Sequence, residues 1–240
     1  MFTVVIPARY GSTRLPGKAL LRIKGKPMIA WVWEQAMRAG ADRVCIATDD
    51  ARIRDEMVGR GAEVQMTNPA HTSGTDRLAE VVQQLSLTDD TIIVNVQGDE
   101  PLMPVANIQR VAAMLSEQSN ADMATLMEPL AIEEAAKASV VKVVVSETGR
   151  ALYFSRAAIP SRRVDTVVAE CHRHIGLYAY RAEFLLRFVS WPPAAIELSE
   201  SLEQLRALAH DAHIQVERAP EASPIGVDTQ EDLNAIRQLL

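Results

Sequence analysis

The chain has few of the residues that mark disulfide-stabilised, zinc-binding or membrane proteins. Only two of its 240 residues are cysteine, Cys45 and Cys171, and they match neither a disulfide framework nor a zinc pattern. No apolar run reaches the roughly 18 residues that a transmembrane helix needs. Arg9 also interrupts the apolar start of the chain, unlike a signal peptide. We therefore expect a cytoplasmic protein without a membrane span.

A general excess of positive charge is also absent, which argues against a nucleic-acid partner. The formal net charge is −6. Residues 1–33 nevertheless contain basic side chains and no acidic one. The bases of this segment are Arg9, Arg14, Lys18, Arg22, Lys24 and Lys26. Positive charge confined to one segment of an acidic chain predicts a site for a compact polyanion.

Short apolar runs alternate with segments of helical period over the first half of the chain. The runs TVVIP, RVCIAT and TIIVNVQ show little polar alternation, which is typical of strands buried on both faces of a sheet. Segments such as 27–40, 50–61 and 75–85 lie between such runs and have helical periodicity. Together they predict an α/β fold with a mainly parallel central sheet flanked by helices. Further helices are expected from about 105 to 118, from 197 to 210 and from 229 to the end.

Strand-like runs follow one another more closely between about 125 and 182. They are MATLM, SVVKVVV, ALYFS and HIGLYAY, and the turn-like residues ETG separate two of them. This spacing predicts a small antiparallel lobe. Because no linker or low-complexity tract interrupts the chain, we expect residues 1–240 to form a single domain that includes this lobe.

The loop after the first expected strand, residues 7–20 (PARYGSTRLPGKAL), combines small and basic residues. Five residues separate Gly11 from Gly17, where a Walker A loop has four, and Ala19 replaces the Ser or Thr that binds magnesium there. The dinucleotide fingerprint G-x-G-x-x-G does not match either. Backbone N–H groups and basic side chains still suit a phosphate group, and a solvated surface loop is the alternative.

Two aspartates lie at the ends of expected secondary-structure elements, one after a strand and one before a helix, at positions suited to a metal. Asp99 comes just after the strand TIIVNVQ, and Asp228 precedes Thr229, which has capping-box spacing with Asp232. Magnesium often binds one or two carboxylates together with substrate phosphates. The two aspartates therefore predict a Mg-nucleotide site. The alternatives are a turn residue at Asp99 and a helix-dipole partner at Asp228.

Other polar residues are candidates for a binding pocket. Ser73, Gly74 and Thr75 precede an expected helix, where they form either an anion or base-edge site or an ordinary N-cap. His174 and Tyr178 share one face of an expected strand and so could line a polar pocket together. Further polar residues in apolar segments, for which a solvent-facing position is the alternative, are Arg156, Glu203 and Gln204.

Seven motifs occur in one order over nearly the whole chain. They are PARYGSTRLPGKAL, SGTDRLAEV, NVQGDEP, ALYFSRAAIP, RHIGLYAYR, LEQLRAL and GVDTQEDL. With them the chain resembles the 3-deoxy-manno-octulosonate cytidylyltransferases, the CMP-Kdo synthetases of lipopolysaccharide biosynthesis. The resemblance implies a Rossmann-like nucleotidyltransferase fold and a homodimer whose contacts involve the lobe at 125–182. It also implies Mg²⁺-dependent transfer of CMP from CTP to the anomeric hydroxyl of 3-deoxy-D-manno-octulosonate (Kdo), with release of diphosphate.

The resemblance also assigns residues to this reaction. Arg14, Lys18, Asp99 and Asp228 would be catalytic, and the two aspartates would hold magnesium. The residues that would bind the nucleotide are Ala8, Arg9, Gly11, Ser12, Thr13, Arg14, Lys18, Ser73, Gly74, Thr75 and Arg77. The residues that would bind the sugar are Gln97, Arg156, His174, Tyr178, Glu203 and Gln204.

Two features depart from the family pattern. Gln230 stands where a proline often begins the last helix. Few acidic and aromatic residues occur between Pro160 and His172, which weakens the expectation of a flap over the sugar. The nearest alternative is a cytidylyltransferase for 8-amino-Kdo or another acidic sugar, such as a sialic acid. A P-loop NTPase conflicts with the loop spacing, and a nucleotide sensor would need neither Asp99 nor Asp228.

Overall fold

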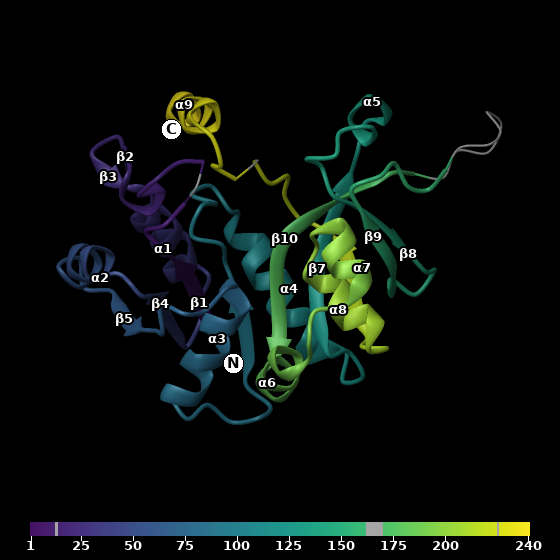
Figure 1. The fold of residues 1–240 in the computed structure, drawn as a ribbon, viewed down its shortest axis with the longest axis horizontal. Coiled ribbons are helices and arrows are strands. Elements are labelled where there is room, and N and C mark those ends of the chain that lie inside the picture. The colour runs from purple at the N-terminus through teal and green to yellow at the C-terminus, as the bar shows by residue number, and fades with distance from the viewer. Residues whose placement is uncertain (13, 162–169, 225) are drawn as a thin grey trace.

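The computed structural model describes residues 1–12, 14–161, 170–224 and 226–240. Within them, one mixed sheet of nine strands forms the centre of the molecule, and helices lie on both of its faces (Figure 1). Seven strands follow the order β11-β7-β10-β6-β1-β4-β5, and the hairpin β8-β9 attaches to β10. The strands are β1 (Phe2–Ala8), β4 (Arg43–Thr48), β5 (Glu63–Met66), β6 (Ile92–Asn95), β7 (Met123–Pro129), β8 (Lys142–Val145), β9 (Ala151–Ser155), β10 (His172–Arg181) and β11 (Ile214–Arg218).

The predicted mainly parallel sheet is confirmed. Strand β1 pairs in parallel with both β4 and β6, β4 pairs in parallel with β5, and β7 does so with β11. Strand β10 runs antiparallel between β6 and β7. The antiparallel region predicted for 125–182 is therefore continuous with the main sheet, because β7 and β10 belong to it and only the hairpin β8-β9 extends beyond.

Side chains alternate between two cores across this sheet, as the period of a strand requires. In β1, Val4 and Ile6 belong to one core and Val5 to the other. The first core includes residues of α1 (Met28–Arg38), α2 (Ala51–Val58) and α4 (Val105–Glu117), whereas the second includes α3 (Gly74–Gln84), α6 (Ala182–Ser190) and α8 (Gln204–Ala209). Because β1 is buried on both faces, its carboxyl end is held rigidly where the first basic loop begins.

The remaining short elements complete the chain. They are the 3₁₀ helix η1 (Lys18–Leu20), the ribbon β2 (Arg22–Ile23) and β3 (Lys26–Pro27), and the helices α5 (Ile132–Ala135), α7 (Ala195–Glu200) and α9 (Gln230–Leu239). Helix α9 packs against the ribbon through a small third core. Within the described ranges, none of the helices combines the length and apolar character that crossing a bilayer demands.

Most predicted helices are confirmed, and one prediction is wrong. Helices α1, α2, α3, α4 and α9 occur where the periodicity predicts them, and Thr229 and Asp232 form the expected capping box of α9. The single helix expected from 197 to 210 is instead two helices, α7 and α8. Ser201 separates them with a left-handed backbone (φ 52°), which a residue other than glycine adopts rarely. Helix α6 was not predicted.

Candidate active site

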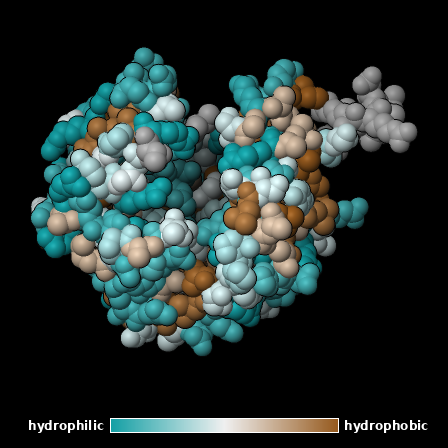
Figure 2. Space-filling model, viewed as in Figure 1, coloured by the Kyte–Doolittle hydropathy of each residue, from teal (hydrophilic) through white to brown (hydrophobic). Residues whose placement is uncertain are grey.

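A cavity of about 310 Å³ opens at the carboxyl ends of β1 and β6. Because these two strands are parallel neighbours, the loops that follow them meet at one edge of the sheet, where α/β proteins bind ligands. Figure 2 shows this part of the molecule as a hollow between its two halves. Eight of the predicted nucleotide-binding residues line it: Ala8, Arg9, Ser12, Arg14, Lys18, Ser73, Gly74 and Arg77.

Two of the predicted nucleotide-binding residues that the structure describes are not part of this lining, and a third lies outside the described residues. Gly11 lies in the loop but does not line the cavity. Thr75 is 2% exposed, and its hydroxyl donates to Glu203 at the start of α8. Thr13 lies outside the described residues, as do residues 162–169, which make up most of the segment where a flap over the sugar was considered. Gln97, predicted for the sugar, lines the nucleotide cavity instead.

The loop after β6 approaches the end of β1 so closely that Gly98 has no room for a side chain. A Cβ atom at Gly98 would lie 2.8 Å from the carbonyl oxygen of Pro7 and 3.2 Å from Cδ1 of Ile29. A Cβ at either distance is too close for an unstrained contact. Glycine at this position therefore lets Asp99 reach the basic loop.

The basic loop is closed on itself by Tyr10 and Gly17. The amide of Gly17 donates to the carbonyl of Tyr10 at 3.0 Å, and Gly17 has a left-handed backbone (φ 68°). The guanidinium of Arg52 lies 3.3 Å above the Tyr10 ring, and Asp50 holds Arg52 by a bidentate ion pair. These contacts hold Tyr10 beside Gly17, the residue directly before η1, which carries Lys18.

Lys18 brings the two predicted catalytic aspartates together. Its Nζ lies 2.5 Å from Oδ2 of Asp99 and 3.1 Å from Oδ1 of Asp228, and Arg14 contacts Oδ2 of Asp228 at 2.9 Å. Burial by itself would lower the pKa of Lys18, but the charges of both aspartates and its hydrogen bonds to them outweigh burial and raise it. The four residues predicted to be catalytic thus form one cluster on the cavity wall.

The donor set of this cluster fits a hard divalent cation. Two carboxylates from separate loops converge on one ammonium group, so both can face one cation. Among the described residues, no group of three His, Cys, Asp or Glu side chains could hold a metal on its own. Two carboxylates completed by substrate phosphates are a common arrangement for magnesium, which keeps part of its coordination sphere for the substrate.

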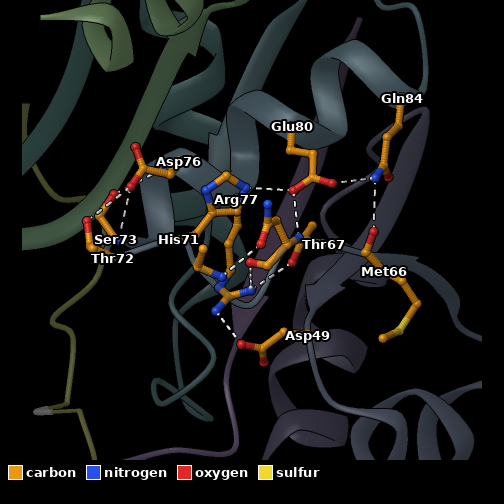
Figure 3. A network of polar contacts seen from close by, with 12 residues as sticks. Asp49, Met66, Thr67, His71, Thr72, Ser73, Asp76, Arg77, Glu80 and Gln84 are labelled. Atoms are coloured by element: carbon orange, nitrogen blue, oxygen red, sulfur yellow. Dashed lines mark hydrogen bonds and ion pairs between the residues drawn. The ribbon is translucent and has the colours of Figure 1, made fainter.

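The N-terminus of α3 forms the opposite wall, and a polar network holds the loop before it (Figure 3). Ser73 caps the helix by accepting from the amide of Asp76, whose carboxylate returns to the amide of Ser73. The buried guanidinium of Arg77 contacts Asp49 at 2.7 Å and Thr67 at 2.8 Å. The start of α3 and Arg77 line the cavity, and the N–H groups of a helix N-terminus favour anions, whereas the charge of Arg77 is already paired with Asp49.

A second cavity of about 350 Å³ lies beside the first, between β10, the segment 139–141 and the start of α8. Asp99 lines the first cavity and the next residue, Glu100, lines the second, so the two cavities meet at this peptide. Three of the predicted sugar-binding residues line the second cavity: His174, Tyr178 and Gln204. The rings of His174 and Tyr178 are 5.3 Å apart, so the predicted shared face of this strand is confirmed.

Besides Gln97, two predicted sugar-binding residues do not line the second cavity. Arg156 directs its guanidinium to the backbone carbonyls of Ala138, Glu200 and Ser201. Glu203 lies at the start of α8, and its Oε2 accepts from Thr75 Oγ1 at 2.5 Å. Both residues therefore lie next to the cavity wall, and each contacts a segment that helps to form it.

Two further residues of this region were not assigned a role from the sequence. Glu100 lines the second cavity, and its Oε2 is buried without a hydrogen-bond partner among the described residues. Burial and the nearby Asp99 raise the pKa of Glu100 to about 8. Lys142 is fully buried and donates to the carbonyls of Lys137, Val140 and Arg156, which ties the wall segment to β9. Its position inside the apolar run SVVKVVV is the sequence signal by which it could have been found.

His174 makes stability depend on pH in the acidic range. Burial, and then the charge of Arg173, lower the pKa of His174 to about 3. The unfolded chain therefore binds a proton that the folded chain excludes, so stability falls as pH drops below about 6.5, the ordinary pKa of histidine. We expect the wild type to lose about 2 kcal/mol more than His174→Gln between pH 7 and pH 5, measured by urea unfolding. Equal losses in both proteins would show that His174 is not held neutral by burial.

Comparison with known proteins places these features in a family. A family model described as cytidylyltransferase matches residues 3–214. The chain is 56% identical to the 3-deoxy-manno-octulosonate cytidylyltransferase of Pseudomonas fluorescens, over 100% of this chain and 98% of that protein. It is 54% identical to the protein of the same name from Vibrio vulnificus, with the same coverage.

A solved structure agrees with these sequence relatives. It is described as CMP:2-keto-3-deoxy-manno-octonic acid synthetase complexed with CTP, and it is 42% identical to this chain. The TM-score is 0.93, and the match covers 100% of this chain and 98% of that one. The chain therefore belongs to the cytidylyltransferase family, and within it to the group of the 3-deoxy-manno-octulosonate cytidylyltransferases.

Proposed function

We propose that the protein transfers CMP from CTP to the anomeric hydroxyl of Kdo and releases diphosphate, a step of lipopolysaccharide biosynthesis. The observation that carries this proposal is the pair of adjoining cavities that meet at Asp99 and Glu100. One has a cationic loop and two carboxylates, and the other has a polar lining suited to a sugar. Relatives more than 50% identical over the full chain are named for this reaction.

The first cavity supplies the groups that a triphosphate needs. Arg14 offers a planar fork of donors and Lys18 a point charge, and both line the cavity. As the anomeric oxygen attacks the α-phosphorus and diphosphate leaves, negative charge shifts toward the leaving oxygens. Fixed cations in a partly buried site stabilise that charge at little reorganisation cost. The N-terminal N–H groups of α3 add further donors from the opposite wall.

We propose that Asp99 and Asp228 hold Mg²⁺ in this cavity. When bound to both carboxylates and to phosphate oxygens, Mg²⁺ would neutralise the leaving group and acidify the attacking hydroxyl. Lys18 contacts both carboxylates at 2.5 and 3.1 Å, so it lies where it would release these oxygens to a metal and turn to the phosphates of a bound nucleotide. Lys18 would thus keep the carboxylates paired before the metal binds and contact the triphosphate afterwards.

The second cavity suits a sugar. Arg173 is the cationic residue among the described residues that line it, and Arg156 lies just behind its wall. His174, Tyr178 and Gln204 add uncharged polar groups for hydroxyls. Because Glu128 already pairs with Arg173 at 2.9 Å and Glu100 also lines the cavity, we propose a sugar that carries a carboxylate from the relatives named for this substrate. The second candidate is a cytidylyltransferase for 8-amino-Kdo or another acidic sugar, which carries the same carboxylate.

Release of diphosphate from CTP tests the proposed function. We expect release that requires both Kdo and Mg²⁺ and that stops when either is omitted. Parallel reactions with 8-amino-Kdo and a sialic acid rank the acidic sugars by kcat/KM. A faster reaction with 8-amino-Kdo would select the second candidate. Phosphate release from ATP or GTP without sugar would support a P-loop NTPase, and CTP binding without turnover of any sugar would support a nucleotide sensor.

We further propose that two copies of the chain pair through the surface of β9 and α7. Leu152 on β9 and Leu198 on α7 expose 57% and 67% of their surface, and Ile196 exposes 37%. Ser155 at the end of β9 donates to Glu200 at the end of α7, so the two elements are neighbours. Light scattering is expected to give a molar mass twice that of one chain, and Leu198→Glu should lower the measured mass toward that of a single chain.

The cytoplasmic location stays a prediction.

A further inference from the structure

A direct hydrogen bond links the walls of the two cavities. Ser73 and Gly74 at the start of α3 line the first cavity, and Gln204 at the start of α8 lines the second. The next residue of α3, Thr75, donates from Oγ1 to Oε2 of Glu203, which precedes Gln204, at 2.5 Å. Each partner of this bond is therefore adjacent in the chain to a residue that lines a different cavity.

The Glu203 carboxylate is held mainly by groups of the nucleotide side. Burial raises the pKa of Glu203, and hydrogen bonds with the side chains of Thr75 and Ser73 oppose that shift. On its own side, the nearest cation is Arg206, whose guanidinium nitrogen is 3.9 Å away, beyond hydrogen-bond reach. Thr75 itself is 2% exposed, so solvent cannot replace its hydroxyl as the donor.

We propose that Thr75 is a positioning residue that couples nucleotide binding to sugar binding through Glu203. The proposal rests on the proposed function, because it assigns the two cavities to the nucleotide and the sugar. A nucleotide that orders the start of α3 also orders the hydroxyl of Thr75, and with it Glu203 and the start of α8. By reciprocity, a sugar that orders the start of α8 favours the nucleotide-bound form of α3 by the same factor.

Two variants and a control separate coupling from a merely structural role. Thr75→Val removes the hydroxyl and keeps the shape of the side chain, whereas Thr75→Ser keeps the hydroxyl. Thr3→Val is the matched control, because Thr3 is similarly buried (5% exposed) but lies at the start of β1, at the opposite end of that strand from the cavities. Calorimetry measures the dissociation constant of Kdo alone and with saturating α,β-methylene-CTP, in the presence of Mg²⁺.

In the wild type and in Thr3→Val, we expect the CTP analogue to tighten Kdo binding at least fivefold. In Thr75→Val this factor should fall to nearly one, while the affinity for the analogue alone changes less than twofold. Thr75→Ser should retain most of the coupling. In steady-state kinetics, Thr75→Val should raise the KM for Kdo about fivefold or more and leave the KM for CTP within twofold.

Three results would overturn the proposal. They are an unchanged coupling factor in Thr75→Val, a loss of coupling in Thr75→Ser as large as in Thr75→Val, and a wild type without coupling. A lower melting temperature with unchanged coupling would assign a structural role to Thr75. If the proposed function is wrong, the wild type will release no diphosphate with Kdo. If only the coupling proposal is wrong, the wild type will release diphosphate, and the coupling factors will contradict the expected values.

Discussion

Asp228→Asn is expected to lower kcat about 10²- to 10³-fold with little change in stability. Asparagine keeps the size of the side chain but removes the charge that Arg14 and Lys18 contact and that we propose to bind Mg²⁺. The side chain of Asp228 is 45% exposed, so folding depends little on its charge. Diphosphate release at saturating CTP and Kdo measures kcat, and urea unfolding measures stability.

A magnesium titration separates the two roles that Asp228 could have. Loss of a metal ligand should raise the Mg²⁺ concentration needed for half-maximal activity, whereas loss of orientation of Arg14 and Lys18 should raise the KM for CTP alone. Asp211→Asn is the matched control, because Asp211 lies in the turn before β11 with a left-handed backbone (φ 58°) that asparagine also adopts. Wild-type turnover of Asp228→Asn at saturating Mg²⁺ would remove Asp228 from the metal site.

The sequence predicts the position of the first cavity for a clear physical reason. Val- and Ile-rich runs without polar alternation indicate strands buried on both faces, and the carboxyl ends of parallel strands share one edge of the sheet. Residues after β1 and β6, including Lys18 and Asp99, are therefore expected together. Asp228 is different, because it comes from a loop 210 residues after Lys18 in the chain. Only the resemblance to a family, and then the fold, brings it to the same site.

The second cavity is harder to predict because its walls depend on tertiary contacts. Periodicity correctly places His174 and Tyr178 on one face of a strand, but it does not reveal that Lys142 anchors the segment facing them. Nor does periodicity reveal that the hydroxyl of Thr75 on α3 donates to Glu203 at the start of α8. Both side chains form bonds with residues distant in sequence, and no local pattern encodes those partners.

The helix expected from 197 to 210 shows most clearly how a tertiary contact overrides local pattern. In one continuous helix, Glu197 and Arg206 would be about 13 Å apart along the axis and on opposite faces. The break at Ser201 folds α7 back, so that their side chains meet at 2.6 Å and 2.9 Å in a bidentate ion pair. Both side chains are only 10% exposed. The pair therefore stabilises the turn that presents Glu203 and Gln204 at the start of α8.

Glu197→Ala is expected to lower the free energy of unfolding by about 3 to 5 kcal/mol, because it leaves the buried guanidinium of Arg206 without its partner. Burial would raise the pKa of Glu197, but hydrogen bonds from Arg206 and from the amide of Ala194 outweigh it and lower the pKa, so the carboxylate is charged at neutral pH. Urea unfolding measures the loss.

Glu134→Ala is the matched control, because its ion pair with Lys137 is exposed and should contribute less than about 1 kcal/mol. The double variant Glu197→Leu with Arg206→Met should recover most of the stability, since no buried charge remains. A loss in Glu197→Ala as small as in the control would show that the ion pair does not hold α7 against α8.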